Sequence, residues 1–578
     1  MEEVTTTLVL KNGSVYTVDR DRRWAQAIAV AKNKIAFVGS NEDVESYIDA
    51  DTVVLDLEGK MVLPAFVDSH MHPAHSAHLY QYQLNLFEVG GKDRIQSYLI
   101  AIRKFANNNP KAPWIIGGGY LRSVFDELGP RKEWLDEIDS TRPIAITSKD
   151  GHSMWVNSRA LELAGITKDT SQPKEGVIKK DPVTGEPSGL LQEPGAMDLV
   201  SRHQPEPIKE QIRESLLWLQ GWLNGKGITT AHEAMLGIDQ PNFYQAYDEL
   251  AQEGKLTVRY RASWNISPEG NVMSQVERGQ ALAKRFNHPH FKAHSFKFFA
   301  DHVIEEETGY LLEPYAHRDD DWCGIKVWDD EIMKQAFALI DSEGYQIHVH
   351  VIGDAAARYT LDALENLLVL NGTRDSRHSF AHLQLARPED IQRMSELGLS
   401  VHTSPYWINI DDYFWKLNLP YLGGKRAFNQ QYPLNSLFEA GANVTVASDF
   451  WVTEPDPMTA IYCGVTRRMP QTVFDREYGE DPGYRWVPDS DAVLEPGDLG
   501  VLPPLEERAD LTDMIVASTY NGAYANFLDG DIGSIEVGKL ADLVVLDQNL
   551  FDIDLEQIPE TRIVMTFFEG RRVYPAVE

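Results

Sequence analysis

The sequence MVLPAFVDSHMHPAHSAH, residues 61–78, passes from an apolar run into four histidines within nine residues. The apolar run predicts a buried strand that ends at Asp68, just before His70 and His72. Side chains alternate between the two faces of a strand, so these two histidines point the same way, about 7 Å apart along the chain. Two imidazoles placed like this can bind one metal ion. H-x-H pairs also arise by chance, so two half-buried histidines without a metal are an alternative.

The composition describes a large globular protein. Its 578 residues are 43% hydrophobic and 24% charged, which provides ample apolar area for a core and gives no sign of disorder. Lys and Arg number 54 against 87 Asp and Glu, a net charge of −33 that is spread along the chain. Such a surface repels phosphate backbones and anionic lipids, so we expect neither nucleic acid nor a membrane as partner. A small-molecule substrate is the expected ligand.

Cysteine content and the N-terminus narrow the class further. Only Cys323 and Cys463 occur, which excludes a disulfide framework and any cysteine-rich zinc or iron–sulfur site, so metal ligands must be nitrogen and oxygen. The sequence MEEVTTTLVLKNG lacks the basic and apolar regions of a signal peptide, and no run of about 18 apolar residues occurs. These features predict a soluble cytoplasmic protein. They leave the oligomeric state open, with a homodimer among the options.

The two chain ends have the same character. Residues 1–60 and 530–578 both contain short apolar strands separated by turn residues. Neither end has enough strands to bury an apolar face by itself. We therefore expect both ends to pair into one small β-sandwich domain, into which the body of the chain, residues 61–529, is inserted.

The body alternates short apolar runs with amphipathic stretches. Runs such as GITTAHEA (227–234), YQIHVHVIGD (345–354) and NVTVASDF (443–450) are typical of strands, and residues 330–344 and 355–372 are typical of helices. This alternation predicts an α/β fold, a (β/α)₈ TIM-like barrel with a parallel sheet. In such a barrel the catalytic groups lie at the C-terminal ends of the strands. Residues from about 107 to 204, rich in Gly and Pro, are predicted to leave the barrel and roof the site.

Polar residues at the predicted strand ends form the candidate site. They are His70, His72, Lys297, His350, His382 and Asp449. Four imidazoles and a carboxylate suit a divalent ion such as zinc, with other divalent metals as alternatives. Six such residues at strand ends are far more specific than the first histidine pair alone.

Lys297 is the unusual member of this set. It lies between Phe296 and Phe298 in a run predicted to be buried, where an unpaired ammonium is costly. With a lowered pKa its amine can react with CO₂ to give a carbamate, an anionic ligand with two oxygens that can bridge two metals. The alternative is an ordinary ion pair with Asp301 or Glu305.

Longer motifs carry a family resemblance. The strand before DSHMH, the later HVIGD, AHLQL and ASDF, and the tail NGAYANFLDGDIGSIEVGKLADLVVLD (521–547) resemble the metal-dependent amidohydrolase superfamily. The motifs SKDGHSMWVNSRAL, SGLLQE, GITTAHEA and KFFADHVIEEETGYLLEPY are similar to its YtcJ-type branch, amidohydrolase family 3, which includes N-substituted formamide deformylases. The resemblance covers nearly the whole chain.

This resemblance implies a binuclear metal centre. The more buried ion would be bound by His70, His72 and Asp449. The second ion would be bound by His350 and His382, with carboxylated Lys297 as the bridge.

The resemblance also implies two catalytic roles and shows one departure. Asp449 would accept a proton from the attacking water, and His152, in DGHSMWVN, would hold or polarise the substrate. The branch usually has Asp-Gly where this chain has Asp301-His302, and Gly permits dihedrals that His rarely adopts. Further histidines near strand ends are each either an unassigned ligand or a packing residue. They are His232, His302, His348 and His402.

The predicted activity is hydrolysis by a metal-activated water. We expect cleavage of a non-peptide C–N bond in an amide, an N-acyl amine or an N-formyl amine. Aromatic residues after the last two barrel strands, among them Trp407 and Trp451, either line a pocket for an apolar or aromatic substrate or pack under the roof. The alternatives are a lactone or carbamate hydrolase, a ring deaminase of the same superfamily, and a non-catalytic regulatory protein.

Overall fold

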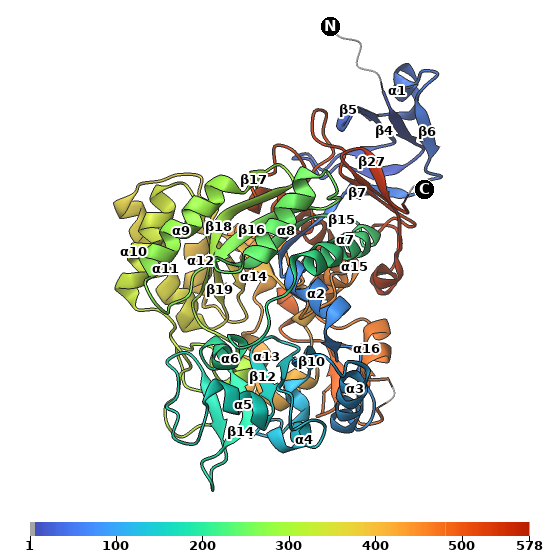
Figure 1. Cartoon of the computed structure of the whole chain (residues 1–578). Helices are drawn as coiled ribbons and strands as arrows, with labels where there is room; N and C mark the ends of the chain where they lie inside the picture. Colours follow the sequence, from blue (N-terminus) through green and yellow to red (C-terminus); the bar gives the residue numbers. More distant parts are fainter. Residues whose placement is uncertain (1–5, 480, 577–578) are drawn as a thin grey trace.

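Figure 1 shows the computed structural model, which describes residues 6–479 and 481–576. A barrel of strands and helices forms the middle of the molecule. Sheets built from the two chain ends lie at one end of it. A separate sheet with its helices, residues 84–201, lies at the other end, and we call this part the roof.

The barrel is built from eight parallel strands. Their order in the sheet follows the chain: β8 (Phe66–Met71), β15 (Ile228–Gly237), β16 (Arg259–Asn265), β18 (Phe291–Phe299), β19 (Gln346–Val351), β20 (Ser379–His382), β21 (Ser400–Thr403) and β22 (Asn443–Val446). Nearly all of their residues are buried, as expected for strands that are covered on both faces. The predicted TIM-like barrel is confirmed.

Two backbone hydrogen bonds link the segment after the last barrel strand to the first strand. The N–H of Asp449 donates to the carbonyl of His70 (2.9 Å), and the N–H of His72 donates to the carbonyl of Phe450 (2.8 Å). Asp68 reinforces this seam, because its carboxylate accepts from the N–H just before Asp449 (3.1 Å). The seam therefore places Asp449 beside the two histidines of the first motif.

Helices cover the outside of the barrel. They include α7 (Lys209–Gly225), α8 (Pro241–Gln252), α9 (Val272–Arg285), α10 (Asp330–Ser342), α11 (Asp354–Leu370), α12 (Pro388–Glu396), α14 (Leu434–Ala440) and α17 (Leu511–Ala517). In α10 the cap residue Asp329 accepts from two N–H groups of the first turn, while Met333, Ala336, Phe337 and Ile340 bury one face. This i, i+3, i+4, i+7 spacing is typical of a helix packed on a sheet.

Shorter elements surround the end of the barrel where the strands finish. Here lie α2 (Pro73–Tyr82), α13 (Leu419–Asn429), α15 (Pro457–Thr466) and α16 (Gln471–Glu477), with the two-stranded sheet of β23 (Arg485–Val487) and β24 (Asp498–Gly500). These segments follow β8, β21 and β22 in the chain and form walls of the site. Helix α18 (Tyr520–Ala525) lies at the other end of the barrel, where the side chain of Asn521 donates to the carbonyl of Val444 near the start of β22.

The roof is a six-stranded sheet inserted after the first barrel strand. Its order is β13 (Val177–Lys180), β14 (Pro187–Gln192), β12 (Ser153–Val156), β11 (Ile144–Ser148), β10 (Ile115–Tyr120) and β9 (Leu84–Asn85), with α3 (Arg94–Asn108), α4 (Lys132–Asp136), α5 (Ser158–Ala164) and α6 (Glu193–Ser201) packed against it. The sequence predicts that the excursion begins at about residue 107, whereas the roof sheet already begins with β9 at Leu84. The amphipathic helix α3 lies between these positions and resembles a barrel helix in sequence, which explains why the predicted start is too late.

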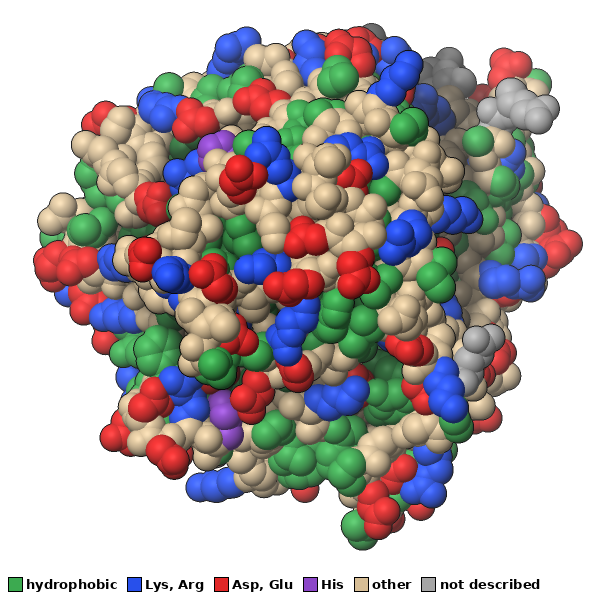
Figure 2. Space-filling model, turned by 60° about the horizontal axis from the view of Figure 1, so that its bottom comes forward, with side chains coloured by type: hydrophobic (Ala, Val, Ile, Leu, Met, Phe, Trp, Pro, Cys, Tyr) green, Lys and Arg blue, Asp and Glu red, His purple; other side chains and the backbone are tan. Residues whose placement is uncertain are grey.

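The surface agrees with a charge that is dispersed along the chain. On the face that the roof presents, acidic and basic side chains are interspersed (Figure 2). Within the described residues, none of the helices combines the length and the apolar character that crossing a bilayer requires.

Two sheets are built from the chain ends. The first has the order β5 (Lys34–Gly39), β4 (Ala27–Ala31), β1 (Leu8–Lys11) and β6 (Val53–Asp56). The second combines both ends, in the order β27 (Arg571–Tyr574), β26 (Ile563–Phe568), β25 (Leu543–Leu546), β7 (Met61–Pro64), β2 (Ser14–Tyr16) and β3 (Trp24–Ala25). Strand β25 is antiparallel to β7, with Val544 opposite Leu63. The two ends of the chain thus share one hydrogen-bonded sheet.

Arg259, at the start of β16, joins the barrel to this mixed sheet. Its guanidinium contacts Asp542 at 2.9 Å and Glu569 at 3.0 Å, and the side chains of Arg259 and Asp542 are each only 2% exposed. Asp542 also accepts from the N–H of Glu569 (2.8 Å). Because the pair is buried, removing one partner leaves the other charge without compensation.

We expect the substitution Arg259→Leu to lower the free energy of unfolding by about 3–5 kcal/mol, since Asp542 stays buried without its cation. Chemical denaturation measures this loss. The matched control is Arg213→Leu, which breaks more exposed ion pairs to Glu249 and Glu253 and should have a much smaller effect. Equal losses in the two variants would contradict the role given to Arg259.

Candidate metal centre and active site

Three side chains converge at the seam of the barrel. His70 is the last residue but one of β8, His72 precedes α2, and Asp449 follows β22. Asp449 Oδ1 lies 3.1 Å from His72 Nε2 and 3.5 Å from His70 Nε2. Ligand atoms of all three residues fall within 4.8 Å of one another, which is the spacing that one metal ion requires.

Polar atoms at this point are buried without a partner. His70 Nε2, His72 Nδ1, His382 Nδ1 and Asp449 Oδ1 form no hydrogen bond to any described residue. An unsatisfied buried donor or acceptor destabilises a protein by about 1–3 kcal/mol, so several at one place indicate a ligand that satisfies them together. A divalent ion with nitrogen and oxygen ligands fits this set.

The other two predicted histidines lie beside the first group. His350 is the last residue but one of β19, and His382 is the last residue of β20. Their ring centroids lie 4.7 Å apart, and the ring centroid of His382 lies 4.8 Å from that of His70. His350 Nε2 donates to the carbonyl of His302 (3.1 Å), which leaves its Nδ1 as the ligand atom. The structure thus gathers all four histidines and Asp449 at one end of the barrel.

The backbone is strained at two of these positions. His382 has φ 78° and Asp449 has φ 53°, both in the left-handed region that residues other than Gly rarely adopt. Strain of this kind persists where the surrounding structure enforces it, typically at functional sites. It turns the two side chains toward the centre of the barrel end.

Burial favours the neutral form of the histidines in this region. Burial is the main cause that lowers the pKa of His70, His350 and His348 well below its ordinary value, and it lowers the pKa of His382 to about 3. Neutral imidazole is the form that binds a metal ion. The same burial that destabilises the charged rings therefore prepares them as ligands.

Lys297 lies on the inner face of β18, opposite His348 of β19. It is 1% exposed, and its Nζ lies 4.7 Å from the centre of the Phe299 ring. Burial lowers the pKa of Lys297 to about 7, although the Asp449 carboxylate opposes this shift. Asp301 accepts instead from the backbone N–H groups of Ile352 and Gly353, and within the described residues Lys297 forms no ion pair with it.

His152 belongs to the roof but lines the same cavity. Its ring centroid lies 5.5 Å from that of His350, and its Nδ1 lies 2.6 Å from Glu193 Oε2. Burial opposes a charge on His152, but the Glu193 carboxylate outweighs it and raises the pKa to about 9. The other side of the ring faces the cavity.

Glu193 and Glu233 lie beside the candidate ligands, although no sequence pattern predicts this position for them. Glu193 is fully buried behind His152, and the fully buried Glu233 has Oε1 4.0 Å from His72 Nδ1, with its other oxygen accepting from Tyr247. Both occur in motifs that carry the family resemblance, SGLLQE and GITTAHEA. Those motifs were the only sequence signal for them, because a single glutamate in an apolar run has no diagnostic spacing.

The extra histidines lie deeper in the barrel or under the roof. His348 Nε2 lies 2.7 Å from His70 Nδ1, and the His402 ring stacks on that of His348. His232 contacts Ser263 through Nε2 and Asn526 through Nδ1. His302 is buried near Glu193, and its backbone lies outside the left-handed region, so the change from Gly causes no backbone strain there.

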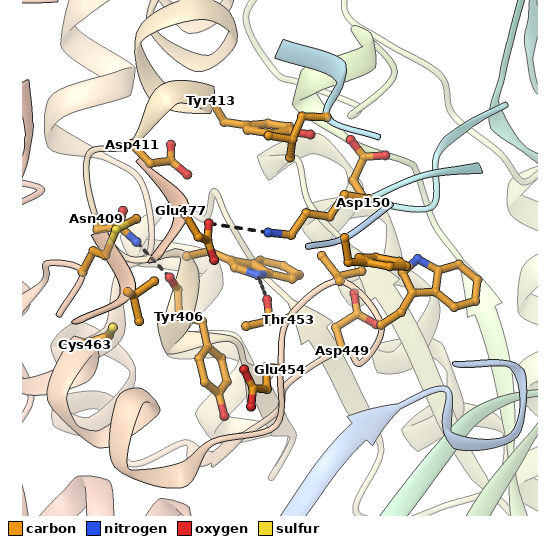
Figure 3. A pocket seen from close by; sticks show the side chains of 18 of the residues that line it. Asp150, Tyr406, Asn409, Asp411, Tyr413, Asp449, Thr453, Glu454, Cys463 and Glu477 are labelled. Carbon is orange, nitrogen blue, oxygen red and sulfur yellow. Dashed lines mark hydrogen bonds and ion pairs between the residues drawn. The ribbon is translucent and has the colours of Figure 1, made fainter. Parts of the chain in front are cut away.

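A cavity of about 680 Å³ opens beside the candidate metal ligands. Figure 3 shows Asp449 on its wall, with Asp150, Tyr413 and Asp411 at other points around it. Trp407 stacks on the ring of His382, with ring centroids 5.4 Å apart. The ring centroids of Trp451 and His72 lie 6.2 Å apart. Both tryptophans line the cavity.

The roof supplies part of the cavity wall. The hydroxyl of Tyr413 accepts from the backbone N–H of Arg122 in the roof (3.1 Å). Lys149, also in the roof, lies 3.7 Å from Glu477 of α16, and both residues line the cavity. The sequence left two roles open for the aromatic residues after β21, lining a pocket or packing under the roof. Both roles occur: some of these residues line the cavity, and at least one contacts the roof.

Known proteins resemble both the sequence and this arrangement. A model of the amidohydrolase family matches residues 53–574, which is most of the chain. This chain belongs to the amidohydrolase family. It is accordingly a hydrolase of a family to which metal-dependent enzymes belong, as the sequence motifs predicted.

Three curated relatives match this amidohydrolase over nearly its full length. It is 28% identical to protein LONG AFTER FAR-RED 3 of Arabidopsis thaliana, over 98% of this chain and 91% of the relative. It is 28% identical to the putative amidohydrolase YtcJ of Bacillus subtilis, over 97% and 98%. It is 24% identical to the N-substituted formamide deformylase of Arthrobacter pascens, over 97% of each chain. The resemblance to the YtcJ-type branch is confirmed.

A solved structure shares the fold. An uncharacterized metal-dependent hydrolase from Pyrococcus horikoshii superposes with a TM-score of 0.70 and 20% identity, covering 95% of this amidohydrolase and 99% of that chain. At this identity the likeness supports the fold alone, including the barrel.

The contact between His348 and His70 fixes which nitrogen of His70 faces the candidate metal. With Nδ1–H of His70 donating to His348 Nε2, the lone pair of His70 Nε2 is left on the side of Asp449. We expect His348→Ala to weaken divalent-metal affinity about 10–100-fold, as loss of such a partner commonly does. Competition with a fluorescent zinc chelator measures the change.

The control for this substitution is His75→Ala. His75 comes from the same first motif, but its ring stacks on Phe243 with centroids 4.0 Å apart. The zinc affinity of the His75→Ala variant should stay at the wild-type value. If His348→Ala also kept that value, His348 would not orient His70.

Proposed function

We propose that this amidohydrolase cleaves a non-peptide C–N bond, in an amide, an N-acyl amine or an N-formyl amine, with a metal-activated water. The convergence of His70, His72 and Asp449, with buried ligand atoms that no described residue satisfies, is the observation that carries the proposal. We propose zinc as the ion, bound by these three residues, with His350 and His382 holding a second.

A bound divalent ion would lower the pKa of water toward 7 and polarise the carbonyl of the substrate. Asp449 Oδ1 is the protein atom placed to accept a proton there, since it faces the first histidine pair and lacks another partner among described residues. From Asp449 the proton can pass to the leaving nitrogen, which departs as an amine. The bond broken is the C–N bond, and the bond formed joins the water oxygen to the carbonyl carbon.

His152 holds the substrate in this proposal. Its Nδ1 is turned to Glu193, and the remaining part of the ring lines the cavity close to His350. From there an N–H can donate to the carbonyl oxygen as negative charge develops on it. Trp407 and Trp451 offer apolar surfaces on the cavity wall for the remainder of the substrate.

Lys297 is proposed to react with CO₂. Its neutral amine forms an N–C bond to CO₂ and releases one proton, which yields a carbamate with two oxygen atoms. Burial, a lowered pKa and the lack of an ion pair to Asp301 support this proposal. The carbamate would be the bridging ligand between the two ions.

Residues of the two terminal sheets share one apolar core. Leu10 and Val30 of the first sheet pack in the same cluster as Val62 and Val545 of the second. We infer from this that the sheets form one β-sandwich domain from the two predicted ends, residues 1–60 and 530–578, extended to Pro64 because β7 belongs to the second sheet. Residues 1–5 and 577–578 of these ends lie outside the described part of the chain. The barrel and roof are inserted between the two ends.

Removal of metal should abolish hydrolysis. After dialysis against dipicolinic acid we expect release of aniline from formanilide and acetanilide to fall at least about 100-fold, because water then lacks its activating ion, and to return on addition of Zn²⁺. The substitution Asp449→Asn should lower kcat, and added Zn²⁺ should not restore it. A parallel panel scores lactone opening and ammonia release from aminated rings. Faster turnover of lactones or aminated rings than of the anilides would show that the enzyme acts on a different bond from the one proposed. Hydrolysis that resists the chelator would contradict the mechanism.

The carbamate can be tested on its own. Protein prepared with ¹³C-bicarbonate should show one carbamate carbon signal by NMR, which is lost in Lys297→Met and kept in Lys292→Met. Lys292 lies on the same strand but is exposed, so it serves as the matched control. A spectrum without the signal, or a signal that survives Lys297→Met, would contradict the assignment.

A further inference from the structure

We propose that His152, Glu193 and His302 form a further divalent-cation site, separate from the ligands described above. The three residues come from different parts of the fold. His152 lies between β11 and β12, Glu193 begins α6 after β14, and His302 follows β18 of the barrel. An ion held by them would join two segments of the roof to one barrel strand.

The geometry fits a single ion. One nitrogen of each histidine and one carboxylate oxygen lie within 4.8 Å of one another. His302 Nδ1 lies 3.3 Å from Glu193 Oε2, and His152 Nδ1 lies 2.6 Å from the same oxygen. Zinc–ligand bonds near 2.0–2.1 Å in a tetrahedral site place ligand atoms about 3.3 Å apart. The first distance matches this value, and the second needs to lengthen by less than about 1 Å.

His302 supplies the independent observation that points to a ligand. His302 is 1% exposed, and both of its ring nitrogens lack a hydrogen-bond partner in the part of the chain that the structure describes. A histidine buried in this way leaves two polar atoms uncompensated, which is unfavourable unless something absent from the coordinates satisfies them. Its Nδ1 lies 3.3 Å from Glu193 Oε2 without meeting hydrogen-bond geometry.

The carboxylate is already oriented for coordination. Glu193 is fully buried, and its Oε1 accepts from the hydroxyl of Thr308, which leaves Oε2 toward the two imidazoles. Its backbone has φ 64°, and its N–H donates to the carbonyl of His152 (2.8 Å). Contacts of this kind behind a ligand fix its direction, as is common at metal sites.

The donor set defines the class of ion. Two imidazoles and one carboxylate suit zinc and other borderline divalent ions rather than magnesium or calcium, which prefer oxygen. His350 does not share this site, because its Nε2 is used by the carbonyl of His302. The proposed ion is therefore additional to those of the candidate active site.

The alternative is a hydrogen-bonded pair of His152 and Glu193 without an ion. That arrangement accounts for the 2.6 Å contact but leaves both nitrogens of His302 unsatisfied. An ion on Nδ1 would place the single proton on Nε2, which is the donor that the proposed role of His152 requires.

Metal content tests the site without reference to activity. Zinc-loaded, desalted protein is analysed by elemental analysis for the wild type, for His302→Ala and for Glu193→Gln. We expect each variant to contain one equivalent less than the wild type. The matched control is His294→Ala, because His294 is also buried with both ring nitrogens unpartnered within the described residues but belongs to neither ligand group. It should keep the wild-type content.

Zinc-edge anomalous diffraction from crystals of the wild type keeps the test valid if a variant fails to fold. We expect a peak between His152, Glu193 and His302 in addition to peaks at the active site. Equal zinc content in wild type and folded His302→Ala, or active-site peaks without this one, would overturn the further site and leave the proposed function intact. Protein without any bound zinc would contradict both.

Discussion

The site depends on the seam where the barrel closes. Two backbone hydrogen bonds, from Asp449 to the His70 carbonyl and from His72 to the Phe450 carbonyl, hold the segment after the last strand against the first. They bring together ligands that are far apart along the chain. Asp68 supports the same contact through the N–H before Asp449. Because the ligands are anchored through the main chain, their placement depends on strand register and not on flexible side chains.

Low polarity around the seam gives the site its chemical character. Burial lowers the pKa of the ring of His70 and of the Lys297 amine, so both groups are favoured in the neutral forms that act as ligands or nucleophiles. In contrast, the carboxylate of Glu193 raises the pKa of His152 in the roof. The two sides of the cavity thus differ in electrostatics: the barrel side combines neutral nitrogen donors with the Asp449 carboxylate, and the roof side holds the charged pair of His152 and Glu193.

Much of the fold and the ligand set could be predicted because their residues show regular patterns. Apolar runs that end in His70, His350, His382 or Asp449 mark strand ends, and the alternation with helices predicts a barrel. Strand β16 was not singled out, because its sequence RYRASWN contains Arg259 and Arg261, which look exposed but are buried. Arg259 finds Asp542 only in three dimensions, and no local pattern reveals a pair 283 residues apart.

The contacts of Glu193 and His302 illustrate the same limit at the site. Each residue lies in a segment whose local sequence indicates a loop or an edge, and their proximity arises from the packing of the roof on the barrel. Local periodicity predicts which side chains share one face of a helix or strand. It does not predict how an inserted sheet packs on the barrel strands, because that packing depends on many weak contacts between distant segments.

The mixed sheet has a consequence for how this protein is made. Strand β7 runs directly into β8, so the segment that carries the first histidines is held between β25 on one side and the seam on the other. Those histidines are synthesised well before β22 and β25, the strands whose segments position them. The nascent chain therefore cannot assemble its active site until β25 has been synthesised, and the first strand must wait for partners that are distant in sequence.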